Sequence, residues 1–429
     1  MGTVLLVALF ILFFVNLPIA FSLGAASTFA MAFQGQVPLT LIPARMFSAV
    51  DSFPLMAIPF FVLAGNLMGE GGISRRLIAF ATSIMGRFTG GLAIVTVATC
   101  MFFAAISGSS AATAAAIGTI LIPAMVKRKY DIRFAAATVA SSAELGVIIP
   151  PSVPMVLYCV MAEQSIGTMF ISGFVPGLLI GVTLMLTAYV ISKKKGFVGT
   201  EKATPKEILV SFKDAILALM MPVIILGGIY GGIFTATEAA VVAVFYGLLV
   251  GVFIYKELNL SNIRKILAES SITTATVMII IANASTFGWI MTREQIPQKI
   301  AEVFISFSGG SPIIFLLLVN ILLLFIGTMF ETSAALIILT PLLYPIAVKL
   351  GIDPIHFGMI MIVNLAVGMV TPPLGINLFI SCNIAKLKIE DLARYLVPYL
   401  AVLIADIFII TYIPQITLWF PTVLGLFNK

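Results

Sequence analysis

Charged residues are scarce in this sequence. Of its 429 residues, 10% are charged and 61% are hydrophobic, whereas a soluble domain carries roughly 25% charged residues. No soluble fold could bury this much apolar surface, so the bilayer must be the solvent for most of the chain. Apolar runs of about 20 residues recur along its length, and this is the span of a transmembrane helix rather than of a barrel strand. The sequence therefore predicts an all-α polytopic membrane protein.

Cysteine and histidine are nearly absent. The spacing of Cys100, Cys159 and Cys382 fits neither a metal site nor a disulfide framework. The single histidine, His356, opens an apolar run without a partner motif, which favours a structural role. A membrane enzyme would need a nucleophile–base pair, metal ligands or a nucleotide loop, and none is recognisable. The net charge of +6 lies in short connectors and not in a basic stripe, so nucleic acid is not an expected partner.

The basic residues orient the chain, because cytoplasmic loops are enriched in lysine and arginine. Arg76 and Lys127 flank two apolar segments, and both should be cytoplasmic. The intervening segment, 90–126, must then enter the membrane and return as a hairpin. A second hairpin, 312–348, is predicted to enter from the opposite side.

One polar stretch divides the chain. Residues 193–212 are predicted to form a cytoplasmic linker between a first half, 1–192, and a second half, 213–429. The run from Thr3 to about Leu23 lacks a basic leading region and a small-residue cleavage site, so we expect a retained helix and not a signal peptide.

The two halves share landmarks at one interval. The interval of 222 residues relates Pro150-Pro151 to Pro372-Pro373, Pro176 to Pro398, Pro123 to Pro345, and Asp131 to Asp353. Each half is predicted to hold its hairpin followed by an interrupted helix, 134–160 in the first and 357–382 in the second. The charge pattern gives the halves opposite orientations. Inverted repeats with interrupted helices are typical of secondary transporters with a binding site at the membrane midplane. The same pairing favours alternating access over a channel.

The tip of each predicted hairpin is polar. The first holds Ser107, Gly108, Ser109, Ser110 and Thr113, and the second holds Gly327, Thr328, Glu331, Thr332 and Ser333. Free carbonyls and hydroxyls at mid-membrane depth suit a hard cation such as Na⁺, and a helix N-terminus suits a carboxylate. The alternative for the first tip is a small-residue packing face. Glu331 is an intramembrane charge, which usually marks a functional pathway; its alternative is a pair with a cation in a buried structural network.

The interrupted helices carry the second set of candidates. Consecutive prolines remove two backbone donors, so the helix opens at Pro150-Pro151-Ser152 and again between Thr371 and Asn377. Unpaired carbonyls persist in a membrane only beside protein, water or an ion, although a simple kink is the alternative. Glu144 and Asn364 lie at similar depths before the two breaks, and each supports the opened segment or makes a plain helix contact. Asp406 is a further intramembrane acid, whereas a capping role suffices for Glu238.

Taken together, the motifs resemble those of the large membrane subunit of tripartite ATP-independent periplasmic (TRAP) transporters, and the resemblance covers essentially the whole chain. The motifs are Phe14-Val15-Asn16-Leu17-Pro18-Ile19-Ala20, Ser107–Thr113, Pro150-Pro151-Ser152, Gly231–Ala240 and Thr371-Pro372-Pro373-Leu374-Gly375. One departure is Ala236, where the family usually has proline.

The resemblance implies a fold and a set of partners. It implies an inverted-repeat elevator-type fold with two re-entrant hairpins, in the bacterial inner membrane. It also implies sodium-driven import of a carboxylate such as sialic acid or a C4-dicarboxylate. The expected partners are a small four-helix membrane subunit and a periplasmic substrate-binding protein. A stand-alone sodium–carboxylate symporter of similar architecture is the alternative.

The resemblance also assigns roles to residues. The substrate would be met by Ser109, Ser110, Thr113, Ser152, Thr332, Ser333 and Asn377. Sodium would be held by Ser107, Gly108, Ser109, Ser110, Pro150 and Pro151 in the first half, and by Gly327, Thr328, Glu331, Thr371, Pro372, Pro373 and Gly375 in the second. Neither tip contains arginine, so we expect the binding protein to choose among carboxylates.

Overall fold

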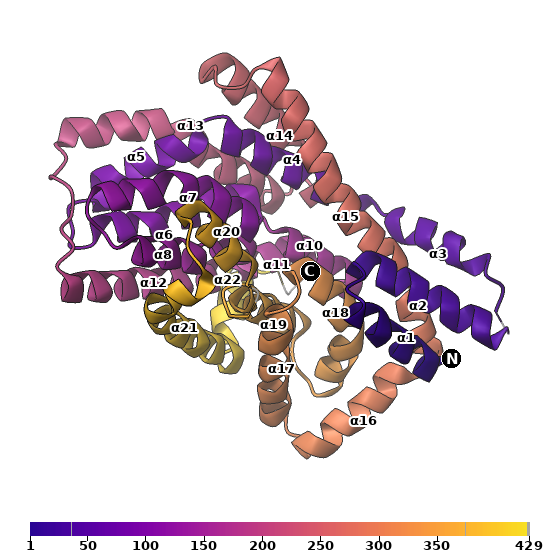
Figure 1. The fold of residues 1–429 in the computed structure, drawn as a ribbon. Coiled ribbons are helices and arrows are strands. Elements are labelled where there is room, and N and C mark those ends of the chain that lie inside the picture. The colour runs from indigo at the N-terminus through magenta and orange to yellow at the C-terminus, as the bar shows by residue number, and fades with distance from the viewer. Residues whose placement is uncertain (36, 374, 427–429) are drawn as a thin grey trace.

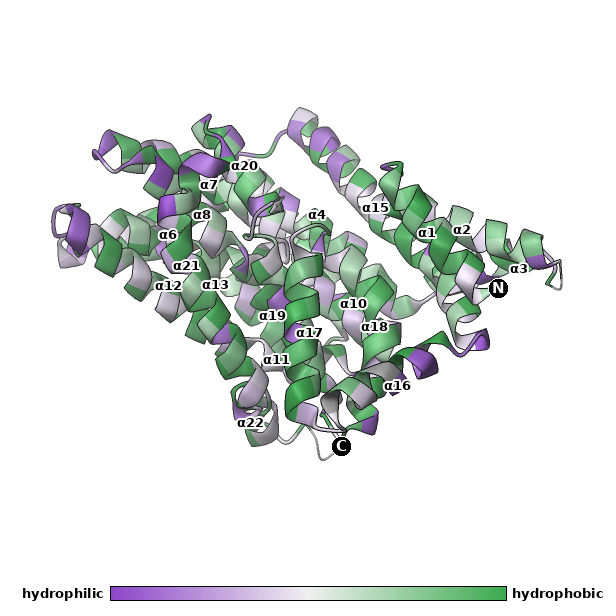
Figure 2. Ribbon diagram, turned by 60° about the horizontal axis from the view of Figure 1, so that its bottom comes forward, coloured by the Kyte–Doolittle hydropathy of each residue, from purple (hydrophilic) through white to green (hydrophobic). Residues whose placement is uncertain are grey.

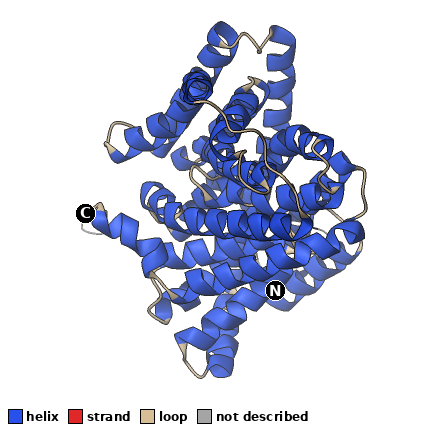
Figure 3. Ribbon diagram, turned by 90° about the vertical axis from the view of Figure 1, so that its left-hand side faces the viewer, coloured by secondary structure: helices blue, strands red, loops and turns tan. Residues whose placement is uncertain are grey.

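The computed structural model describes residues 1–35, 37–373 and 375–426, apart from the side chains of residues 303, 305 and 308. Every regular element within these residues is helical (Figures 1 and 3). By length and composition, eight described helices could cross a membrane, or nine if the bent pair Ile132–Ile148 and Val153–Ala162 is one span. The predicted all-α polytopic architecture is therefore confirmed.

The first elements along the chain run from α1 to α13, and α13 begins in the predicted linker and extends into the second half. They are α1 (Gly2–Phe14), α2 (Ile19–Gln34), α3 (Leu41–Val50), the 3₁₀ turn η1 (Phe53–Met56), α4 (Ala57–Glu70), α5 (Ile73–Met85), α6 (Gly91–Ser107), α7 (Ser110–Lys127), α8 (Ile132–Ala143), α9 (Leu145–Ile148), α10 (Val153–Ala162), α11 (Ile166–Ser172), α12 (Phe174–Lys195) and α13 (Pro205–Tyr230). The remaining elements are α14 (Ala236–Leu249), the π-helical turn η2 (Val250–Ile254), α15 (Leu260–Arg293), α16 (Ile296–Ser308), α17 (Pro312–Gly327), α18 (Thr332–Lys349), α19 (Pro354–Gly368), α20 (Ile376–Ala385), α21 (Ile389–Tyr412) and α22 (Gln415–Val423).

The N-terminal apolar run is not one helix. It divides into α1 and α2 at Asn16-Leu17-Pro18, where Asn16 has a left-handed backbone (φ 62°) and Pro18 caps α2. Proline cannot donate the hydrogen bond that a continuous helix needs, and it biases the preceding residue toward extended backbone. The two helices pack against each other. The expectation of a single helix to about Leu23 is corrected accordingly.

The polar stretch between the halves is also shorter than predicted. Helix α12 continues through Lys195 and ends at Gly196, which has a left-handed backbone. Helix α13 begins at Pro205, after a capping box in which Thr204 and Glu207 bond reciprocally. Only residues 196–204 are therefore non-helical within the predicted linker 193–212.

The segments around the two double prolines follow the same element order. Helices α7 and α18 begin at residues 110 and 332 and end at 127 and 349, so both bounds recur at the 222-residue interval. Asp131 and Asp353, at the same interval, cap the following helices α8 and α19 with their carboxylates. Each of these helices then breaks at its double proline, before α10 in the first half and before α20 in the second.

A long helix separates two groups of elements. Helix α15 has 34 residues, which gives a length of about 51 Å. It runs obliquely across the molecule, with α2 and α3 against one side and α4 against another (Figure 1). Helices α6, α7, α8, α12, α20 and α21 gather beyond α4, away from α2 and α3.

Hydrophobic residues run along most of the long helices, and hydrophilic residues gather near helix ends and connectors (Figure 2). Large exposed side chains such as Phe10, Leu186 and Phe245 are more than half accessible. Exposed apolar surface on this scale requires a lipid environment.

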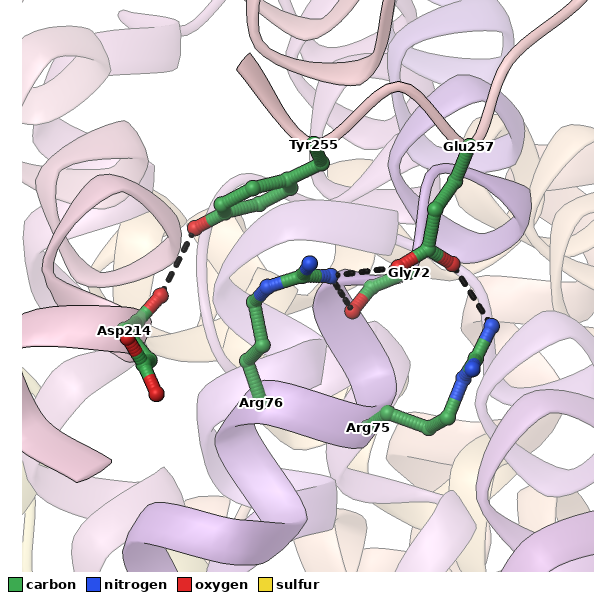
Figure 4. A network of polar contacts seen from close by, with 6 residues as sticks. All are labelled: Gly72, Arg75, Arg76, Asp214, Tyr255 and Glu257. Atoms are coloured by element: carbon green, nitrogen blue, oxygen red, sulfur yellow. Dashed lines mark hydrogen bonds and ion pairs between the residues drawn. The ribbon is translucent and has the colours of Figure 1, made fainter. Parts of the chain in front are cut away.

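A polar network fixes the start of α5 (Figure 4). Glu257, just after η2, accepts hydrogen bonds from Arg75 at 2.6 Å and from Arg76 at 2.8 Å. The Arg76 guanidinium also stacks 3.6 Å from the ring centroid of Tyr255. The Tyr255 hydroxyl in turn donates to the backbone carbonyl of Asp214 on α13 at 2.9 Å. These contacts connect α5, α13 and the segment after η2 through groups that do not touch the hairpin tips.

Candidate functional site

The tip between α6 and α7 brings several hydroxyls and backbone carbonyls close together. Gly108 reverses the chain with a left-handed backbone (φ 61°). The hydroxyls of Ser107 and Thr113 lie 3.0 Å apart, and Thr113 donates to the Ser109 carbonyl at 2.8 Å. Ser109 caps α7 by accepting from the Ala112 amide at 3.4 Å. The first predicted tip residues are thus brought together, with Ser110 in the first turn of α7.

The first prolyl break closes on this tip. The Val153 amide donates to the Gly108 carbonyl at 3.3 Å. A Cβ atom on Gly108 would lie 2.9 Å from the Pro151 carbonyl oxygen, so only glycine permits this approach. Ser152 caps α10 and donates its hydroxyl to the Val147 carbonyl at 2.7 Å. Pro150, Pro151 and Ser152 are all buried.

A glycine contacts each hairpin where two backbones approach closely. A Cβ atom on Gly146 would lie 2.5 Å from the Ser109 carbonyl oxygen and 2.6 Å from the Thr113 hydroxyl. Gly368 lies 222 residues later, and its Cβ atom would lie 2.5 Å from the carbonyl carbon of Gly327. Each hairpin therefore rests against a glycine in the helix that precedes its double proline.

The second tip is organised by a carboxylate. Glu331 is the N-cap of α18, and it accepts from the Ser333 amide at 2.8 Å, the Ser333 hydroxyl at 2.9 Å and the Ala334 amide at 3.2 Å. These bonds satisfy donors that a helix start otherwise leaves free. Glu331 occupies the position that Ser109 occupies in the first half. The described residues provide no basic side chain paired with Glu331.

The second prolyl break is more open than the first. Pro372 and Pro373 are exposed and Thr371 is half-buried, while Leu374 lies outside the described residues. Thr371 donates to the Val367 carbonyl at 2.9 Å, within its own helix. Gly375 has a left-handed backbone (φ 51°), and the Asn377 amide donates to the Met369 carbonyl at 3.1 Å.

The two tips meet at a residue that the sequence interpretation missed. The Met369 sulfur lies 3.5 Å from the Ser110 hydroxyl and 3.0 Å from the Thr332 hydroxyl. Ser110 and Thr332 are the first residues of α7 and α18. The N-terminal ends of two helices from different halves therefore converge on one side chain next to the second break. A methionine gives no signal in a scan for charged and hydroxyl residues.

Some of the predicted site residues form no hydrogen bond with the others among the described residues. Within the described residues, the hydrogen bonds include none between Glu331 and the segment from Thr371 to Gly375. The Thr328 hydroxyl donates to the Phe325 carbonyl, one turn earlier in its own helix. Both side-chain polar atoms of Asn377 are buried without a protein partner in this part of the chain. A buried amide costs free energy unless it is hydrogen-bonded, so Asn377 has bonding capacity left for a ligand or water.

The other intramembrane polar residues take different roles. His356 is bonded through both ring nitrogens, to the Thr417 hydroxyl at 2.8 Å and the Thr411 carbonyl at 3.2 Å, which confirms a structural role. Asn364 donates to the Asn320 side chain at 2.9 Å, a plain contact between α19 and α17. Asp406 accepts from Thr183 at 2.6 Å. Both carboxylate oxygens of Glu144 are buried without a partner among the described residues.

The candidate ligand atoms at the tips are oxygens. No group of three or more histidine, cysteine or acidic side chains that could hold a metal ion occurs within the described residues. The tips instead offer hydroxyls, backbone carbonyls and one carboxylate, which are the ligands that hard cations prefer. The converging helix N-termini add partial positive charge at the same place.

Comparison with known proteins decides the family. Residues 6–416 match the family model described as the DctM component of the tripartite ATP-independent periplasmic transporters. The chain belongs to this family. DctM-family chains are transporter subunits of the bacterial inner membrane, and this protein is accordingly a multi-pass inner-membrane protein. The resemblance found in the sequence motifs is thereby confirmed.

Several characterised relatives are similar over nearly the whole chain. An isethionate TRAP transporter permease protein of Oleidesulfovibrio alaskensis is 48% identical over 95% of this chain, and the chain spans 64% of that protein's length. A C4-dicarboxylate TRAP transporter large permease protein of Pseudomonas aeruginosa is 44% identical, with 94% of this chain and 95% of that protein covered. A sialic acid TRAP transporter large permease protein of Vibrio cholerae is 40% identical, with 96% of each covered.

A solved structure shares the fold. The YdaH transporter of Alcanivorax borkumensis, whose crystal structure is described as having an unusual topology, superposes with a TM-score of 0.62. The alignment covers 87% of this chain and 86% of that one, at 14% sequence identity. At that identity the likeness concerns the architecture alone.

Proposed function

We propose that this chain is the translocating subunit of a sodium-coupled importer for a small organic anion such as a carboxylate. The observation that carries the proposal is the convergence of α7 and α18 on Met369. Two helix N-termini direct the partial positive charge of their dipoles, and the Ser110 and Thr332 hydroxyls, to one point. A carboxylate placed there would meet Ser109 and Ser110 from the first tip and Thr332 and Ser333 from the second. The unpaired amide of Asn377 supplies a further donor.

The oxygen atoms beside each tip are proposed sodium ligands. In the first half they are the Ser107 hydroxyl and the carbonyls around Gly108, Ser109 and Pro151, which lie within a few ångströms of one another. In the second half Glu331 contributes a charge, and the opened backbone from Thr371 to Gly375 contributes carbonyls. Sodium would neutralise the charge of the substrate carboxylate and order both tips around it. The tips, the ions and the substrate would then cross the membrane as one unit in an elevator movement.

The names of the relatives support a small organic anion as the class of substrate. Their names specify isethionate, C4-dicarboxylates and sialic acid, and all of these are small organic anions. The proposed partners are a small four-helix membrane subunit and a periplasmic binding protein, in keeping with the family description. No arginine lies in either tip, which supports selection of the substrate by the binding protein.

The test is uptake into proteoliposomes that contain this chain and its small partner subunit. Uptake of sialic acid, a C4-dicarboxylate and isethionate is measured with and without an inward sodium gradient and a binding protein. We expect uptake to require both. Uptake with sodium alone would favour the stand-alone symporter, and uptake without a gradient would favour a channel. Ser110→Ala or Thr332→Ala with full sodium-coupled uptake would contradict the assigned substrate site.

A further inference from the structure

A second binding feature lies far from the tips, on the lipid-facing surface. A groove of about 550 Å³ runs between α12 and α21. We refer to it as the α12–α21 groove. Its wall includes Leu186 and Val190, which are 58% and 48% exposed. Both helices are long and apolar enough to cross the membrane, so the groove opens toward lipid chains.

The polar side chains in the groove wall are already satisfied. Thr183 donates to the Asp406 carboxylate at 2.6 Å, and Thr187 donates to the Thr183 carbonyl at 2.8 Å. Neither hydroxyl therefore needs water or a polar ligand. The middle of the groove presents an apolar wall, which suits an acyl chain.

One end of the groove is strongly basic. Lys194 and Lys195 in the last turn of α12 and Arg394 near the start of α21 line it, and no acidic residue lines it. None of the three forms an ion pair with a described residue. Lys195 lies 5.8 Å from the ring centroid of Tyr395.

Two of the acids near this end are engaged elsewhere, and Glu390, one turn before Arg394 on α21, lies outside the groove lining. Asp391 accepts from the Lys388 amide at 3.0 Å, where it caps α21. Asp131 pairs with Arg133 at 3.0 Å and accepts from the Tyr395 hydroxyl at 3.0 Å. No carboxylate among the described residues pairs with the three cations that line this end of the groove.

The positive-inside rule explains basic residues at a helix end without any binding site. It does not explain why cations from two helices, 200 residues apart in sequence, line the end of one apolar groove. The distance along α12 from Thr183 to Lys195 is about 18 Å at 1.5 Å per residue. This slightly exceeds half of a hydrocarbon core of about 30 Å, which is the depth that the acyl chains of one leaflet reach.

We propose that the α12–α21 groove binds an anionic phospholipid, with its phosphate between Lys194, Lys195 and Arg394 and one acyl chain along Leu186 and Val190. Basic pockets between transmembrane helices on the cytoplasmic side recognise anionic head groups in this way. The groove lining includes none of the residues assigned to the tips or the prolyl breaks, so the inference does not rest on the proposed mechanism.

The first test measures lipid selectivity. The purified chain is offered equal amounts of phosphatidylglycerol and phosphatidylcholine, and the retained lipids are counted by native mass spectrometry. We expect a preference for phosphatidylglycerol of about fivefold or more, given the contribution of each basic residue near an anionic surface. The triple variant Lys194→Gln, Lys195→Gln and Arg394→Gln should lose the preference. Equal retention by the unsubstituted chain, or an unchanged preference in the variant, would overturn the proposal.

A matched control separates a site from a general charge effect. Lys127, Lys129 and Arg128 are exposed basic residues at the end of α7 and do not line the groove. Their triple replacement by glutamine removes the same charge, and the preference should persist. Loss of the preference in both triple variants would contradict a defined site.

The second test locates the lipid. The chain has two tryptophans, Trp289 and Trp419, which are replaced by phenylalanine before Leu186→Trp is introduced as a reporter. Brominated phosphatidylglycerol should quench this reporter more strongly than brominated phosphatidylcholine at the same mole fraction. Absence of selective quenching would place the lipid elsewhere. Loss of all quenching on addition of the small partner subunit would show that protein covers the groove, and would equally overturn the proposal.

Discussion

The two prolyl breaks differ in how far they are closed. Pro150 and Pro151 are buried, and their loop is tied to the first tip through Val153 and Gly108. Pro372 and Pro373, at the matching positions of the second half, are exposed. The described hydrogen bonds of Thr371 and Asn377 in the second loop stay within its own segment, and only Met369, just before the loop, reaches the tips. Two stretches with the same prolines thus differ in surroundings, and we expect ligands to enter and leave by the second.

The helix caps differ in the same direction. Ser109 caps α7 through one long hydrogen bond of 3.4 Å, whereas Glu331 caps α18 through three bonds of 2.8 to 3.2 Å. Hydrogen bonds to a charged acceptor are roughly twice as strong as neutral ones. The first tip is held mainly by burial against its break, and the second mainly by its own charged cap.

The largest effect is expected where glycines support the tips. Gly146→Ala and Gly368→Ala would each place a Cβ atom 2.5 Å from backbone atoms of the opposing hairpin, so one of the two segments must move. Overpacking of this kind costs ~1–3 kcal/mol. If the same energy is added to the transport barrier, uptake falls by about fivefold to more than a hundredfold. Proteoliposome uptake and thermal unfolding measure the two effects.

Gly227→Ala is the control for these glycines. A Cβ atom there would meet nothing within 4 Å, and its backbone has no left-handed conformation. We expect Gly227→Ala to raise the free energy of unfolding by at most about 1 kcal/mol, because alanine favours helix. Uptake should not change. Full activity of Gly146→Ala would show that the first tip is less closely held than the structure indicates.

The difference in closure itself can be measured by cysteine labelling. Pro151→Cys and Pro373→Cys are compared in a chain in which Cys100, Cys159 and Cys382 are replaced by alanine. A water-soluble maleimide should label position 373 at least ~10-fold faster, because each ~1.4 kcal/mol of local opening free energy slows labelling tenfold. Denatured samples of both variants should react alike. Equal rates in the folded chains would refute the comparison.

Much of this arrangement follows from local chemistry that a sequence displays. Double prolines must interrupt a helix, and Gly108 with its flanking serines must end one. Asp131 and Asp353 stand where N-caps are favoured. The 222-residue interval then pairs the halves, and the structure reproduces it in the bounds of α7 and α18.

The features that the sequence did not predict depend on contacts between elements that are distant along the chain. The role of Met369 depends on its place in the fold, where its sulfur lies between the Ser110 and Thr332 hydroxyls. The unequal burial of Pro151 and Pro373 arises from the helices packed around them, and two identical dipeptides carry no sign of it. The break at Pro18 was readable in principle, but the apolar run on both sides concealed it.

Met369 allows a sharper test, because it belongs to the second break but contacts the first tip. Met369→Leu keeps the volume and should cost less than ~1.5 kcal/mol of stability. It removes the sulfur that Ser110 and Thr332 approach, so we expect a several-fold rise in the KM for substrate. Met359→Leu is the control, since Met359 is fully buried on the same helix. An equal effect of both substitutions would assign Met369 to packing alone.

The smallest effect should come from the cap at Ser109. Replacing an N-cap by alanine costs ~0.5–2 kcal/mol. Glu331→Ala removes three bonds and should lie near the upper end of this range, whereas Ser109→Ala removes one bond of 3.4 Å and should lie at the lower end. Thr235→Ala, at the capping box of α14, calibrates the measurement outside the site. Unfolding in mixed micelles would give the three values. If Ser109→Ala costs as much as Glu331→Ala, the first tip depends on its cap after all, and burial against Pro151 is not what holds it.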